Sequence, residues 1–188
     1  MANDRVSKQT AGSVMPDLDQ TVHQASRGDQ NAFIKLWKWF YPRILKFLFT
    51  LTKEAEDLCS EVWIKVAAAI KGYPGDGAAF TAWLYTIARN HAIDHLRQKK
   101  RRGSHTEIQD SDWVGEDQRP SDVTDLLRNL KSEEAEIISL RVVAGFDVPA
   151  VAQITGKSEA NVRVIAHRAL NKLQKELVAT GYYGGGAS

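Results

Sequence analysis

The chain has a single cysteine, Cys59, among its 188 residues. An internal disulfide is therefore excluded, and a reducing compartment such as the cytoplasm is the expected setting. The sequence also lacks an apolar run long enough to cross a membrane, and its N-terminus, MANDRVSKQT, has no hydrophobic segment typical of a signal peptide. We expect a protein that is neither secreted nor anchored, with Cys59 as a small core residue.

Residue patterns that carry catalysis or bind metals are scarce as well. His91 and His95 have the spacing of a helical metal-binding pair, but Ala92 takes the place of the glutamate in H-E-x-x-H and no third ligand is evident. The glycine-rich stretches PGDGAA and GGGAS lack the strand, lysine and helix of a phosphate-binding loop. The sequence gives no basis for an enzyme, and no metal or cofactor is expected.

Strand-like alternation and fixed-period repeats are also missing, so the expected fold is all-α. Composition and patterning favour two small helical domains joined by a flexible acidic linker, the second carrying a helix-turn-helix that is winged-helix-like without strands. The expected divisions are a disordered arm at 1–17, a first domain at 18–102, a linker at 103–121, a second domain at 122–178 and a flexible tail at 179–188.

Three helices are expected in the first domain, at residues 32–52, 54–72 and 80–102, where apolar residues recur at helical spacing. Pro42 predicts a kink or a break near Tyr41, and Gly72 is a plausible helix end. Phe80 and Trp83 complete an apolar stripe and favour the core, whereas Tyr85 is expected to be the freer ring.

The formal charge of +2 conceals a strong segregation of charge along the chain. Residues 89–102 carry six basic side chains against one acid, Asp94, whereas residues 107–125 carry seven acids against Arg119 alone. A basic surface that could follow nucleic acid is thus followed directly by an acidic connector.

Residues 147–178 predict two short helices joined by a tight turn. Asp147 is the expected N-cap of the first helix, Gly156 supplies the turn, and Ser158 can cap the second helix. The second helix places polar and cationic side chains outward, as a DNA-recognition helix requires. An ordinary amphipathic hairpin with a solvated cationic face is the simpler alternative. The outward residues are Asn161, Arg163, Val164, His167, Arg168 and Lys172.

The order of these segments resembles that of bacterial sigma factors of the extracytoplasmic-function (ECF) group, which keep the second and fourth conserved regions of the sigma-70 family. The resemblance covers about residues 20–178. It is carried by RGDQNAF, EDLCSEVWIKV with the glycine loop, FTAWLYTIARNHAIDHLRQKKRR, LLRNLKSEEAEIISLRVVAGF and VRVIAHRAL. It implies an alternative sigma factor that binds core RNA polymerase, directs recognition of minus-35 and minus-10 promoter elements and helps to open the DNA. A stand-alone helix-turn-helix regulator and an all-helical interaction module remain the alternatives.

The resemblance also implies contact residues. Core polymerase would be bound by Asp57, Glu61 and Lys65, although Ser60 stands where many family members have glutamine. The minus-10 element would be contacted by Arg89, Asn90, Arg97, Lys99, Arg101 and Arg102, beside a loop at 72–79 that could form the wall of a base pocket. The minus-35 element would be contacted by Ser158, Glu159, Asn161, Arg163, His167, Arg168 and Lys172.

Some of these contacts have a simpler structural alternative. Asp57 and Glu61 could merely solvate a helix face, and Glu159 is favoured in a first helical turn by the helix dipole.

Family members are often held inactive by an anti-sigma factor, so such a partner is expected. The acids of the linker resemble the charge of a nucleic-acid strand, and a soluble spacer is the competing explanation.

Overall fold

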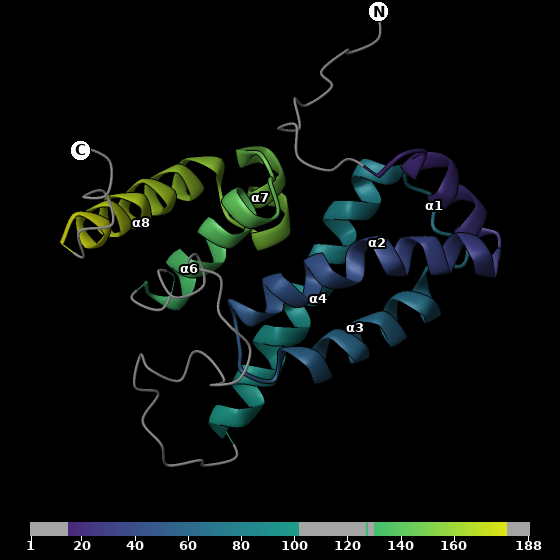
Figure 1. Ribbon diagram of the computed structural model, residues 1–188, viewed down its shortest axis with the longest axis horizontal. Coiled ribbons are helices and arrows are strands. Elements are labelled where there is room, and N and C mark those ends of the chain that lie inside the picture. Colours follow the sequence, from purple (N-terminus) through teal and green to yellow (C-terminus); the bar gives the residue numbers. More distant parts are fainter. Residues whose placement is uncertain (1–14, 102–126, 128–129, 180–188) are drawn as a thin grey trace, which may run out of the picture.

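The computed structural model describes residues 15–101, 127 and 130–179, and within these ranges all regular structure is helical (Figure 1). This confirms the expected all-α fold. Residues 1–14 of the expected arm, the linker at 103–121, Arg102, most of the residues at 122–129 and the expected tail from residue 180 lie outside the described residues. The helices are α1 (Leu18–Ser26), α2 (Gln30–Phe49), α3 (Ala55–Ala69), α4 (Gly77–Arg101), α6 (Ser132–Ile138), the π-helical turn η1 (Ser139–Val143), α7 (Val148–Thr155) and α8 (Glu159–Ala179).

Helix α2 packs against each of the other three helices of the N-terminal lobe, which comprises α1 to α4. It begins at Asp29, whose carboxylate accepts hydrogen bonds from the backbone N–H groups of Asn31 (2.8 Å) and Ala32 (3.1 Å). The prediction near Tyr41 is a kink or a break, and the break is absent because the helix runs through Pro42 without ending. Proline removes the bond to the carbonyl of Lys38. Both residues are exposed, and water can satisfy that carbonyl.

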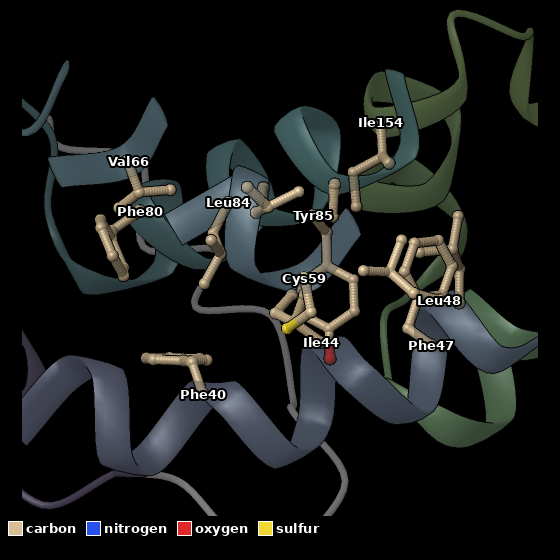
Figure 2. Close-up of a cluster of buried hydrophobic side chains, with 14 of the residues drawn as sticks. Phe40, Ile44, Phe47, Leu48, Cys59, Val66, Phe80, Leu84, Tyr85 and Ile154 are labelled. Atoms are coloured by element: carbon tan, nitrogen blue, oxygen red, sulfur yellow. The ribbon is translucent and has the colours of Figure 1, made fainter. Parts of the chain in front are cut away.

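Aromatic and aliphatic side chains of α2, α3 and α4 fill the core of this lobe (Figure 2). Cys59 is fully buried among them, as predicted, and burial raises the pKa of its thiol to about 12. Tyr85 is only 3% exposed, so the prediction of a free ring is wrong. Its ring packs edge-on against Phe47 and, at 4.9 Å between centroids, against Phe146. Phe146 is distant in sequence, so the periodicity of α4 alone could not reveal this burial.

The C-terminal lobe, α6 to α8, contains the predicted helix-turn-helix. The Asp147 carboxylate accepts from the Ala150 N–H (2.9 Å), Gly156 has φ of 69°, and the Ser158 hydroxyl accepts from the Asn161 N–H (3.2 Å). These local predictions are confirmed. Before the motif, the chain changes at Ser139 from the α-helix α6 to the π-helical turn η1.

The two lobes pack against each other along α4. One apolar cluster continues from the N-terminal lobe into the C-terminal lobe, where it includes Ile137, Leu140, Val151 and Ile154. Helix α7 packs against α4 (Figure 1). We call this the closed arrangement. None of the described helices has the length and apolarity needed to cross a membrane.

Candidate nucleic-acid and protein interfaces

The first predicted surface, the exposed face of α3, is tied to α4 by a histidine. Asp57, Glu61 and Lys65 all reach solvent, with the Glu61 side chain 57% exposed. His91 of α4 lies between the last two: its Nε2 is 2.6 Å from Glu61 Oε2 and its Nδ1 is 2.7 Å from Lys65 Nζ. Sequence reasoning considered His91 only as a metal ligand. Its contacts depend on how two helices align, and no local motif encodes that alignment.

The same two helices are linked again nearer the end of α4. Lys99 Nζ is 2.7 Å from Glu54 Oε1, and His95 Nε2 is 4.0 Å from Glu54 Oε2. Burial alone would raise the pKa of Glu54, but hydrogen bonds from Lys99 and Thr52 lower it to about 2. Within the described residues no cluster of three or more histidine, cysteine or acidic side chains could hold a metal ion.

The predicted minus-10 residues of α4 are thus only partly free. Asn90, Arg97, Lys99 and Arg101 are exposed, although Arg97 lies 3.6 Å from Asp94 and Lys99 is paired as described.

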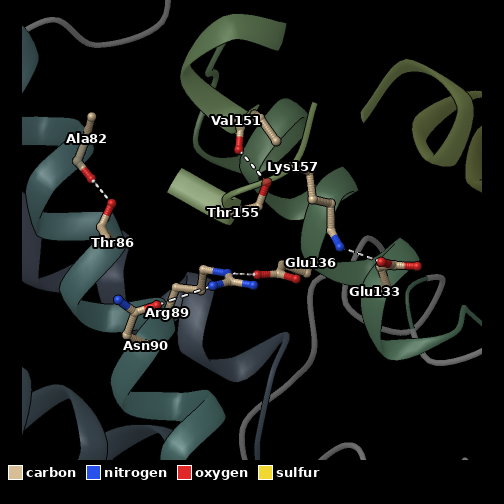
Figure 3. Close-up of polar contacts among 9 residues, drawn as sticks. All are labelled: Ala82, Thr86, Arg89, Asn90, Glu133, Glu136, Val151, Thr155 and Lys157. Atoms are coloured by element: carbon tan, nitrogen blue, oxygen red, sulfur yellow. Dashed lines mark hydrogen bonds and ion pairs between the residues drawn. The ribbon is translucent and has the colours of Figure 1, made fainter. Parts of the chain in front are cut away.

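Arg89 joins the two lobes. Its Nε donates to Glu136 Oε1 of α6, and its Nη1 lies 3.2 Å from Asn90 Oδ1 (Figure 3). The side chains of Arg89 and Glu136 are only 16% and 9% exposed. In the closed arrangement the Arg89 side chain is thus mostly covered, and its Nε–H is bonded to Glu136.

The loop that leads into α4 is fastened to α1. The Gly77 N–H donates to Asp19 Oδ1 and the Gly72 N–H to the Ser26 carbonyl, each at 2.8 Å. A Cβ added at Gly77 would stand 2.5 Å from Leu18 Cγ, so glycine is needed there for close approach. This loop, predicted as the wall of a base pocket, is thus bonded to α1 at two points.

Sequence reasoning missed the aromatic side chain of this loop. The Tyr73 ring lies 4.9 Å from that of Trp83, centroid to centroid, and both rings are half-buried. A partly exposed aromatic pair can stack on an unpaired base. The only sequence signal for it was an aromatic residue inside a glycine-rich loop.

The third surface is the outer face of α8. Asn161, Arg163, His167 and Arg168 are exposed on its N-terminal half, and Glu159 Oε2 pairs with Arg163 Nη2 at 2.6 Å. Exposed polar, planar and cationic groups on one side of the second helix are what direct reading of base edges and phosphates requires.

Lys172, also predicted to contact DNA, pairs with a carboxylate of its own lobe while 43% of its side chain stays exposed. Its Nζ lies 2.9 and 2.7 Å from the two carboxylate oxygens of Glu134, which is largely buried. Burial opposes ionisation of Glu134, but the hydrogen bonds from Lys172 and from the Lys131 backbone lower its pKa. This pair links α8 to α6, so Lys172 has a structural contact whether or not it also meets DNA.

Comparison with known proteins follows the same division of the chain. Residues 36–102 match the family model described as Sigma-70 region 2, and residues 121–173 match the model described as Sigma-70, region 4. SigD of Mycobacterium tuberculosis, an ECF RNA polymerase sigma factor, is 30% identical over 183 residues, covering 88% of this chain and 86% of SigD. BldN of Streptomyces coelicolor, another ECF sigma factor, is 27% identical over 171 residues, covering 84% of this chain and 65% of BldN.

A solved structure agrees with this assignment. RpoE of Bartonella quintana, crystallised with the anti-sigma factor NepR, superposes with a TM-score of 0.62 at 28% identity and covers 77% of this chain and 96% of RpoE. The resemblance inferred from the five sequence segments is confirmed. The chain belongs to the extracytoplasmic-function RNA polymerase sigma factors, and is an alternative sigma factor of the sigma-70 family.

Proposed function

We propose that the chain directs core RNA polymerase to promoters through three separate surfaces. The exposed face of α3 docks on the polymerase, the basic half of α4 contacts the minus-10 element, and the outer face of α8 contacts the minus-35 element. One observation carries the proposal: the two helices with outward cations, α4 and α8, fall in the segments that match regions 2 and 4.

The minus-10 contact would also help to open the DNA. Strand opening without ATP requires that the protein bind the unpaired strand more tightly than the duplex. Asn90 is exposed and can bond to a base edge, the aromatic pair Tyr73 and Trp83 can stack on a base, and Arg97, Lys99 and Arg101 can follow the phosphates.

On α8 the proposed division is between base and phosphate contacts. Arg168 is exposed and can bond with guanine or phosphate. Arg163 is exposed as well, beside its partner Glu159, and Asn161 and His167 are exposed on the same half of the helix. Ser158 serves first as a helix cap, and Glu159 as the partner of Arg163.

The closed arrangement affects how Arg89 can meet promoter DNA. Only 16% of the Arg89 side chain is exposed while its Nε–H is bonded to Glu136, so promoter binding is proposed to separate the lobes. An anti-sigma factor is a proposed partner, because the homologous RpoE was crystallised with one. The protein is proposed to act in the cytoplasm and to catalyse no reaction of its own.

Run-off transcription tests this function. Core RNA polymerase would be incubated with and without the chain on fragmented DNA from the source bacterium. Discrete new start sites that share two upstream elements are the expected result. DNA binding without new transcripts and without core association would instead identify a stand-alone regulator.

A further inference from the structure

One histidine joins the helix proposed to meet the polymerase to the helix proposed to meet DNA. The imidazole of His91 accepts a hydrogen bond from Lys65 at Nδ1 (2.7 Å) and donates one to Glu61 from Nε2 (2.6 Å). A lysine ammonium only donates, and an ionised carboxylate only accepts. The two contacts therefore assign a neutral ring with its proton on Nε2.

The three side chains differ in how far they reach solvent. His91 is packed between α3 and α4 with 13% of its side chain exposed, whereas Glu61 is 57% exposed and Lys65 is exposed. Long charged side chains on a helix surface otherwise sample many rotamers. Ordering one of them on binding costs about 2- to 12-fold in affinity. A fixed ring that already bonds to both removes part of that cost.

We propose that His91 is a positioning residue, which holds Glu61 and Lys65 in the geometry that core RNA polymerase meets. This inference rests on the proposed function of α3. It adds that α4 sets the side-chain conformation of the polymerase-facing surface, although His91 itself is mostly covered.

The alignment of α3 and α4 has other sources, so the role of His91 can be separated from folding. Buried Val62 and Val66 of α3 and Ala88 and Ala92 of α4 lie in the same apolar core. A second polar link, Lys99 to Glu54, joins the helices nearer the start of α3. Loss of the imidazole should therefore free Glu61 and Lys65 while the helices remain packed.

The test measures the affinity of the full-length chain for core RNA polymerase purified from the source bacterium, by competition against a fluorescently labelled chain. His91→Leu should weaken binding by about 5- to 30-fold, because two side chains lose their order. His91→Gln, which keeps a donor and an acceptor, should restore most of the affinity. His95→Leu is the matched control: His95 is one turn away and faces Glu54, and its loss should leave core affinity unchanged.

A second test, in a chain that lacks both partners of His91, distinguishes a positioning role of His91 from a merely structural one. In a Glu61→Gln, Lys65→Met chain, the further change His91→Leu should have no effect on core affinity, because its partners are gone. An equal loss in both backgrounds, or wild-type affinity of His91→Leu in the parent chain, would overturn the inference. A wild-type chain that does not bind core polymerase would instead overturn the proposed function of α3.

Discussion

Glu136→Gln should open the closed arrangement. The pair between Glu136 and Arg89 is nearly buried and links α6 to α4. Hydrogen bonds to charged groups contribute about 1.5 to 3 kcal/mol. Glutamine keeps one acceptor oxygen for the guanidinium, so we expect a loss of about 1.4 kcal/mol, or a tenfold change in the ratio of closed to open molecules.

Distances between spin labels measure that ratio directly. Labels on cysteines introduced at Ala68 of α3 and Gln174 of α8, both exposed, report on the separation of the lobes. The native Cys59 should stay unlabelled because it is buried and its thiol pKa is raised to about 12. Glu136→Gln should increase the longer-distance population about tenfold relative to the closed one.

A matched control lies one turn away on α6. Glu133 pairs with Lys157 of the same lobe at 2.5 Å, so Glu133→Gln removes an acid from α6 without touching α4. Its distance distribution should equal that of the parent chain. Unchanged distances in Glu136→Gln, or the same opening in both variants, would refute the assignment of this pair as the link between the lobes.

Two further predictions concern promoter use and acid stability. Arg168→Ala should reduce transcription by about tenfold at promoters that depend on the minus-35 element. Asn90→Ala should instead slow strand opening, measured by permanganate reactivity. An equal loss of core polymerase binding in both variants would contradict this division. Glu54→Gln should lower the free energy of unfolding by about 1 kcal/mol at pH 7, after allowance for solvent screening of a partly exposed pair. The pKa of Glu54 falls from 4.5 to about 2 on folding, so its contribution is complete above pH 4.5 and disappears as pH falls toward 2. Urea unfolding at pH 7 and pH 3 should show a smaller difference at pH 3, and an equal difference would exclude this carboxylate as the cause.

Local chemistry explains which features could be predicted from sequence. Asp147, Gly156 and Ser158 act within four residues of their own positions, so their roles as cap, turn and cap follow from residue type and spacing. The helical face of α8 was predictable for the same reason, because buried and exposed positions repeat with the helical period.

Long-range contacts explain what could not be predicted. Tyr85 is covered by Phe146, and Arg89 by Glu136, through packing between lobes that are far apart in the sequence. Lys172 likewise meets Glu134 across two helices. A helix carries the same residues whether its outer face meets water, DNA or another lobe, and only the tertiary arrangement distinguishes these cases.

The internal pairing of cations alters how the chain should respond to salt. A free lysine or arginine that binds a phosphate releases condensed counterions, and each such contact steepens the salt dependence of DNA affinity. Arg89 and Lys99, however, already have a carboxylate partner. When a DNA phosphate replaces that carboxylate, the number of ion pairs stays the same. The released carboxylate then remains as an unpaired negative charge near the DNA. The unassisted chain should therefore bind arbitrary DNA more weakly than its basic helix suggests, which keeps it available for polymerase in a genome crowded with nonspecific sites.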